Sequence, residues 1–98
     1  MPPELKMQRQ NSIMRISKLK LLFEVGDLLS SEIVTAPLEP GPKDRWIVEF
    51  VRRNGARVAL SLDRKVSGRD QVRIFNSLDG AFSACRQIGF RGAKIQES

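Results

Sequence analysis

The chain has 98 residues and a formal net charge of +6 at pH 7, and 41% of its residues are apolar against 29% charged. This composition is typical of one globular domain with a modest core, and no apolar run approaches the ~18 residues of a membrane span. One cysteine and no histidine exclude an internal disulfide and a Cys–His nucleophile, so we expect no enzymatic activity, no metal site and no cofactor. The single cysteine fits a reducing compartment and no secretory signal is visible, so we expect a cytoplasmic protein.

Residues 1–11 combine two prolines with mixed charges, which predicts a flexible arm before a single domain over 12–98. Ser12 is a good N-cap for a helix over 12–25 that ends at Gly26. One apolar stripe runs along this helix: Ile13, Ile16, Leu19, Leu22, Phe23 and Val25. We interpret the stripe as a face that packs on the sheet or on a second copy, rather than as a membrane-surface helix, and we expect no membrane partner.

The next segment allows two interpretations. Residues 33–36 read as a short edge strand or as part of a linker between helix and sheet. Pro37, Pro40 and Pro42 then predict a loop, because proline cannot donate a ladder hydrogen bond.

Residues 45–75 predict a three-stranded antiparallel sheet. The first two strands alternate large apolar residues, and a three-residue loop with Gly55 in the left-handed conformation pairs Phe50 with Val58. The third strand, 71–75, is expected to turn its apolar residues toward the core. The predicted core face carries Trp46, Val48, Phe50, Val58, Leu60, Leu62, Val72 and Ile74.

Ser77 caps a second helix over 77–88, whose buried stripe includes Cys85 and which Gly89 ends. Residues 93–96 allow an optional short fourth strand at the C-terminus. The expected fold class is therefore α+β, with an N-terminal helix, a three-stranded antiparallel sheet and a second helix packed on that sheet.

Basic residues are concentrated in the predicted sheet. Residues 45–73 hold eight basic side chains against three acidic ones, a surplus of five out of the chain's +6. Such a surface suits an anionic partner, and arginine forks onto phosphate or guanine edges. A solvated sheet face is the alternative interpretation. The candidate nucleic-acid-binding residues are Arg52, Arg53, Arg57, Arg64, Lys65, Arg69 and Arg73.

Apolar residues that such a nucleic-acid surface does not need form a second candidate site. They suit a partner or a second copy, so a protein-interaction or dimerisation module without nucleic-acid binding is the alternative function. The candidate interaction patch contains Ile13, Ile16, Leu19, Phe23, Ile47 and Val51.

The runs RWIVEFVRRNGARV and VRIFNSLDGAFSAC resemble the sheet-plus-helix DNA-binding domains of plant ethylene-response factors and of some tyrosine recombinases. That resemblance implies DNA contact through Arg53, Arg57 and Arg73. The pieces KLKLLFEVGDLLSSEIV, TAPLEPG, WIVEF and VRIFNSLDGAFSACRQIGF are similar to small plasmid-encoded partition-associated proteins of the ParC type. That similarity implies a non-enzymatic accessory protein of plasmid maintenance or partition, whose partner is duplex DNA or another maintenance protein, with a homodimer left open.

Overall fold

A computed structural model describes residues 12–35 and 45–96 of the chain. The predicted arm over 1–11 lies outside the described residues. Two helices and five strands follow one another along the described part of the chain: β1 (Ser12–Met14), α2 (Ile16–Glu24), β2 (Leu28–Thr35), β3 (Trp46–Arg52), β4 (Arg57–Leu60), α3 (Leu78–Ile88) and β5 (Lys94–Gln96).

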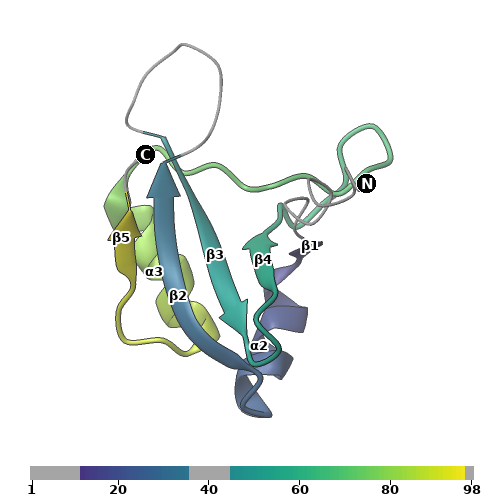
Figure 1. Ribbon diagram of the computed structural model, residues 1–98. Helices are drawn as coiled ribbons and strands as arrows, with labels where there is room; N and C mark the ends of the chain where they lie inside the picture. The colour runs from purple at the N-terminus through teal and green to yellow at the C-terminus, as the bar shows by residue number, and fades with distance from the viewer. Residues whose placement is uncertain (1–11, 36–44, 97–98) are drawn as a thin grey trace, which may run out of the picture.

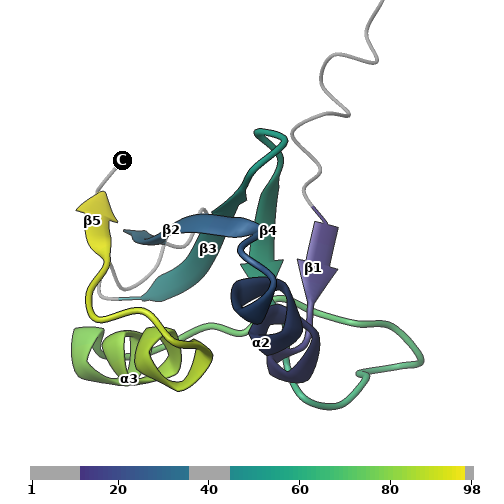
Figure 2. The ribbon, with the colours of Figure 1, turned by 90° about the horizontal axis from the view of Figure 1, so that it is seen from below.

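The strands form one mixed sheet in the order β1-β4-β3-β2-β5. The central strands β4, β3 and β2 are antiparallel, and each edge strand runs parallel to its neighbour. Both helices lie on the same side of the sheet, with α3 packed on β2 and β3 and α2 packed on α3 (Figures 1 and 2). The α+β class is thus confirmed, whereas the predicted three-stranded sheet is corrected to five strands.

The N-terminal helix is shorter than predicted. Ser12–Met14 form β1, which pairs with Val58–Leu60 of β4, so Ser12 is not the N-cap. The helix starts at Ile16 behind Arg15, which makes no side-chain cap bond, and the chain turns at Gly26 with φ of +79°. Long-range pairing along the free edge of β4 therefore overrides the local helical pattern at residues 12–14.

β2 is the largest omission from the sequence prediction, because it is an eight-residue strand between β3 and β5 rather than a short edge strand. Polar residues at its centre conceal the strand pattern. Ser31 is nevertheless buried, and its hydroxyl donates to the Gly92 carbonyl oxygen at 2.8 Å. Glu32 is buried as well and is paired with Arg57. Each polar group has an internal partner that a linear pattern does not reveal.

The β3–β4 hairpin agrees with its prediction. Phe50 pairs with Val58, and the Arg52 amide donates to the Ala56 carbonyl at 2.8 Å across a three-residue loop. Gly55 has φ of +91°, the left-handed conformation that the loop requires. The register therefore turns Val48, Phe50, Val58 and Leu60 into the core, as expected.

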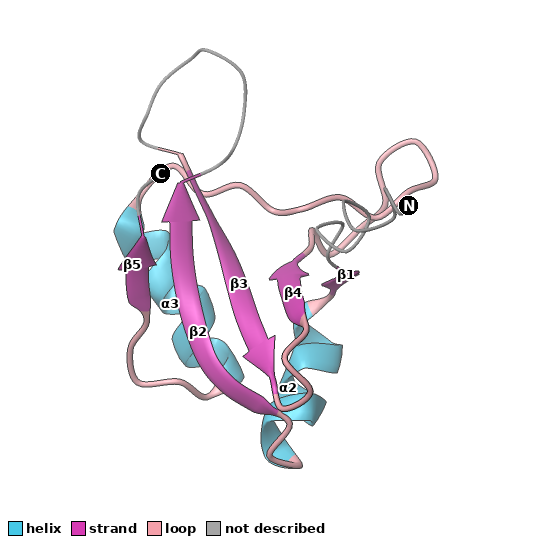
Figure 3. Cartoon of the chain, viewed as in Figure 1, coloured by secondary structure: helices cyan, strands magenta, loops and turns pink. Residues whose placement is uncertain are grey.

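The predicted third strand is wrong in its details. Residues 71–75 do not form a continuous strand (Figure 3). They make two isolated β-bridges, from Val72 to Ser61 and from Phe75 to Trp46. Ile74, predicted to face the core, is 38% exposed, while Phe75 is 7% exposed and packs in the core. Phe75 pairs with Trp46 of β3 while Val72 pairs with Ser61 at the end of β4, so the segment crosses the sheet instead of continuing it.

α3 matches its prediction closely. The Ser77 hydroxyl accepts from the Gly80 amide at 3.1 Å, and the helix ends before Gly89. Gly89 has φ of +140°, and an added Cβ would clash with the ring of Phe23 in α2. The Phe23 ring also meets Phe90 edge-on at 4.9 Å, which joins the two helices at this corner.

The sheet face turned away from the helices, which we call the open face, follows from the strand registers. It combines apolar and ionic side chains: Ile13, Glu32, Val34, Ile47, Glu49, Val51, Arg57 and Ala59.

Candidate nucleic-acid interface

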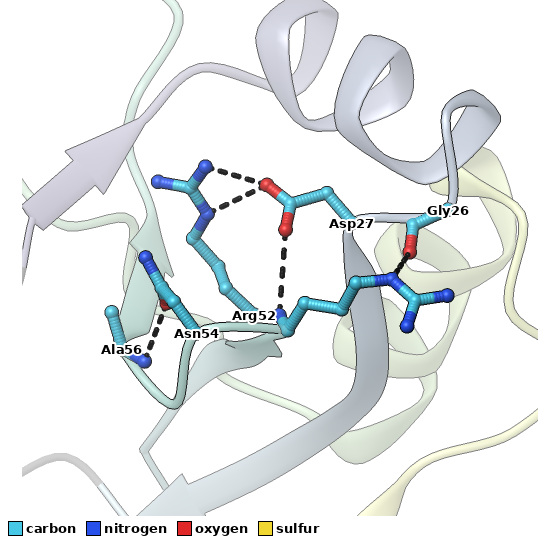
Figure 4. A network of polar contacts seen from close by, with 6 residues as sticks. Gly26, Asp27, Arg52, Asn54 and Ala56 are labelled. Atoms are coloured by element: carbon cyan, nitrogen blue, oxygen red, sulfur yellow. Dashed lines mark hydrogen bonds and ion pairs between the residues drawn. The ribbon is translucent and has the colours of Figure 1, made fainter.

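Two of the seven candidate basic residues, Arg52 and Arg53, form hydrogen bonds to the turn between α2 and β2 (Figure 4). Arg52 donates from Nε at 2.8 Å and from Nη2 at 2.5 Å to one Asp27 carboxylate oxygen. Arg53 donates from Nε to the Gly26 carbonyl at 2.9 Å, and its amide donates to the Asp27 carbonyl at 2.8 Å. These bonds fasten the β3–β4 hairpin to the end of α2, which gives both arginines a structural role.

Arg57 lies on the open face between two carboxylates. Its guanidinium is hydrogen-bonded to Glu32 and, at 2.9 and 3.1 Å, to Glu49. These hydrogen bonds, above all the one to Glu32, raise the pKa of Arg57 above its ordinary value despite desolvation. Glu32 and Glu49 are direct cross-strand neighbours that would repel each other without the arginine. The group has one cation against two anions, so the centre of the open face has no positive charge to offer to phosphate.

Arg73 has a third kind of contact. Its guanidinium carbon lies 4.7 Å from the centre of the Phe75 ring, a cation–π arrangement, and the residue is half-buried. Arg53, Arg57 and Arg73 therefore have different partners in different parts of the molecule, instead of forming one arginine surface on the sheet.

The other three candidates lie on a projecting loop, residues 62–71, which we call the basic arm (Figure 1). The Leu62 amide donates to the Gln71 carbonyl at 2.8 Å at its base, and Val66 and Arg69 exchange backbone hydrogen bonds of 2.8 and 3.0 Å near its tip. Ser67 and Gly68 between them have φ of +54° and +78°, the values of a type I′ turn. The cations Arg64, Lys65 and Arg69 are exposed, and their side chains have no hydrogen-bond or ion-pair partner among the described residues.

Arg15, which the sequence analysis did not single out, holds the base of the basic arm. Its guanidinium lies 3.3 Å from the Asp70 carboxylate, and the Ser61 amide donates to the Met14 carbonyl at 2.9 Å. The ion pair with Arg15 partly neutralises the Asp70 carboxylate. The basic arm therefore has three cations and one acid, Asp63, that is unpaired within the described residues. The Ser-Gly pair at the tip is the one local signal from which the arm could have been predicted.

The candidate interaction patch is divided between two surfaces. Leu19 is fully buried, and Ile16 and Phe23 pack against the core beneath the sheet. Ile13, Ile47 and Val51 lie on the open face instead, where Ile47 is only 7% exposed. The six residues therefore do not form one continuous docking surface.

The sequence predicts neither a catalytic centre nor a metal site, and no cluster of three or more metal-ligating side chains occurs within residues 12–35 and 45–96. Cys85 is fully buried, and desolvation raises the pKa of its thiol. None of the described helices has the length and apolar character needed to cross a membrane.

No family model, curated protein or solved structure matches the chain. The resemblances drawn from the sequence consequently stay predictions.

Proposed function

We propose that the protein is a small non-enzymatic accessory protein that binds DNA through the basic arm. The observation that supports this most is the exposure of Arg64, Lys65 and Arg69 on one projecting loop, where their side chains bind no other described residue. Arg52, Arg53 and Arg57 contribute little to this contact, because each would have to leave an intramolecular hydrogen bond to reach a phosphate.

The mechanism is phosphate neutralisation. Each phosphate contact releases counterions, so the logarithm of affinity falls with the logarithm of salt by about 0.9 per contact on duplex DNA. Three arm cations therefore correspond to a slope of roughly −3. This is a modest footprint, and we expect binding with little sequence preference.

Duplex DNA is the preferred ligand within this proposal. Single-strand binders stack bases on exposed aromatic rings. All six aromatic residues of this chain, Trp46 and the five phenylalanines, are buried or half-buried. A backbone contact suits a duplex, whose phosphates are regularly spaced and whose bases need not be unstacked.

A role in plasmid partition or maintenance, in a cytoplasmic setting, is part of the proposal. It has its support in the sequence resemblance to the ParC-type proteins and in no structural observation. The partner would then be the plasmid itself or another maintenance protein.

The test compares two triple variants of equal charge in a DNA-shift assay. Arg64→Ala, Lys65→Ala and Arg69→Ala together should weaken duplex binding by about tenfold or more and flatten the salt slope by roughly 3. The matched control removes Arg86, Lys94 and Arg91, three exposed cations outside the arm, and should change both quantities far less. Equal losses in the two variants would mean that net charge alone, not the arm, governs binding.

An interaction module without DNA binding is the second candidate function. Ile13 and Val51 favour it, because they lie half-buried on the sheet face that no described helix covers. Val51→Ser should then lower self-association or partner binding in sedimentation while leaving the fold unchanged. A wild-type protein that binds no DNA but sediments as a dimer would favour this candidate over the first.

A further inference from the structure

α2 is apolar on two sides, although one apolar side is enough to pack a surface helix. Toward the sheet, Leu19 is fully buried and Phe23 packs against the core. On the opposite side, Leu21 is 62% exposed and Val25 is 75% exposed. The sequence-based prediction that Val25 belongs to the buried stripe is therefore wrong. Leaving two large aliphatic side chains in water has no explanation in the packing of α2.

Leu29, four residues beyond Val25 in the sequence, is a third exposed apolar residue near this end of α2. It is 56% exposed and lies at the irregularity where β2 begins to pair with β3. Leu21 and Val25 are neighbours on the helix surface at a spacing of four residues, and Leu29 follows Val25 after the tight turn at Gly26. These three are the most exposed large apolar residues in the described part of the chain, and together we call them the α2 patch.

Cations surround the α2 patch. Lys18 precedes Leu21 by one helical turn and is exposed, as is Lys20. Arg53 reaches the Gly26 carbonyl next to Val25. Glu24 is the exposed acid of this region, since Asp27 is occupied by Arg52. Three cations against one free anion give the surroundings of the patch a positive surplus of two.

A second copy of the chain is a poor occupant for this surface. Two copies meeting through the patch would bring together two regions of the same positive sign. At ~25 cal/mol per Å2 of apolar surface removed from water, the 1.5–3 kcal/mol gained by burying one aliphatic side chain corresponds to an area of roughly 60–120 Å2. Three such side chains therefore supply about 300 Å2 of apolar surface. A stable protein interface needs about 800 Å2 from each partner. An anionic lipid surface attracts the cations instead of repelling them, and it needs no such contact area because it accepts isolated aliphatic side chains.

We infer that the α2 patch is a membrane-contact site, which inserts Leu21, Val25 and Leu29 into the headgroup region of an anionic bilayer while Lys18 and Lys20 meet the lipid phosphates. This departs from the sequence-based expectation of no membrane partner. The contact is peripheral and reversible, since a nine-residue helix with three inserted side chains lies on a bilayer and does not cross it. It is independent of the proposed DNA contact, which uses the basic arm.

The experiment is co-sedimentation of the full chain with large unilamellar vesicles. We expect binding to vesicles of phosphatidylcholine and phosphatidylglycerol in a 1:1 ratio and little binding to pure phosphatidylcholine. The double variant Leu21→Ser, Val25→Ser should lower the partition coefficient about tenfold. Both residues are exposed, so circular dichroism should report an unchanged fold. The matched control Ile95→Ser removes a 43%-exposed aliphatic residue from β5 and should bind as the wild type does.

Two further measurements separate the inference from simpler electrostatic attraction. In a Leu21→Trp variant, anionic vesicles should shift the fluorescence to the blue, because the new indole enters the interface while Trp46 stays buried. The triple arm variant should keep its vesicle binding. Loss of vesicle binding in the arm variant together with wild-type binding of the double serine variant would overturn the inference, as would the absence of any binding to anionic vesicles.

Discussion

The β3–β4 hairpin and the basic arm follow one another in the sequence and each contain three basic residues, yet their cations have opposite roles. Arg52, Arg53 and Arg57 are bound to Asp27, Gly26, Glu32 and Glu49 within the fold. Arg64, Lys65 and Arg69 have no such partner among the described residues. A charge surplus counted along the sequence therefore overstates the charge that the folded surface can offer to a ligand.

The largest effect on stability is expected from Arg57→Ala. Removing the guanidinium leaves the buried carboxylate of Glu32 beside the half-buried carboxylate of Glu49, which should destabilise the fold by about 2 kcal/mol. Urea denaturation measures this loss. Arg86→Ala on the surface of α3 is the control and should stay within about 0.5 kcal/mol of the wild type. Equal stability of the two variants would mean that the open-face ion pairs contribute nothing.

Asp27→Asn should have the next largest effect. The change removes the charge that holds Arg52 at the end of α2, and we expect a loss of about 1–1.5 kcal/mol. Thermal unfolding measures the loss, with Asp63→Asn as the control because Asp63 is an exposed acid of the basic arm. If Asp63→Asn proved the more destabilising change, the structural role assigned to the hairpin arginines would be lost.

The triple arm variant should hardly alter stability. Its three side chains are exposed and make no hydrogen bond or ion pair within the described residues, so the free energy of unfolding should move by less than about 0.5 kcal/mol. A loss of DNA affinity without a loss of stability would separate a binding role from a structural one. A marked drop in the unfolding midpoint would place these cations in the same class as Arg52 and Arg57.

The smallest effect is expected at the tip of the arm. Ser67 has φ of +54°, a conformation in which asparagine is better tolerated, and Asn-Gly is the favoured pair for a type I′ turn. Ser67→Asn should therefore stabilise the arm by about 0.5 kcal/mol, as hydrogen exchange of the Arg69 amide would report. Faster exchange in the variant would exclude the type I′ turn.

Local patterns predicted the parts of this fold that local interactions determine. The β3–β4 register follows from alternating apolar residues and Gly55, and α3 follows from the Ser77 cap and a stripe ending at Gly89. β1 was missed, and β2 was predicted only as a possible short edge strand at its end, because both strands depend on distant partners. Ser31 can be buried because its hydroxyl donates a hydrogen bond to the Gly92 carbonyl oxygen. Residues 12–14 are extended because they pair with the edge of β4.

The candidate sites likewise combine a part that the sequence predicts and a part that depends on distant partners. Which cations are present could be read from the sequence, but which ones remain available could not, because Asp27, Glu32 and Glu49 are eight to twenty-five residues away from the arginines they bind. The α2 patch was hidden for a related reason. Helical spacing alone does not decide which of two apolar sides the rest of the chain will cover.

The arginine Nε–Hε signals, followed by NMR while a short DNA duplex is added at low salt, report which guanidinium groups contact the DNA. The signals of Arg64 and Arg69 should shift as duplex is added, while those of Arg52, Arg53 and Arg57 should keep both their positions and their slow exchange with water. Shifts of the three hairpin arginines with unchanged arm signals would contradict the account.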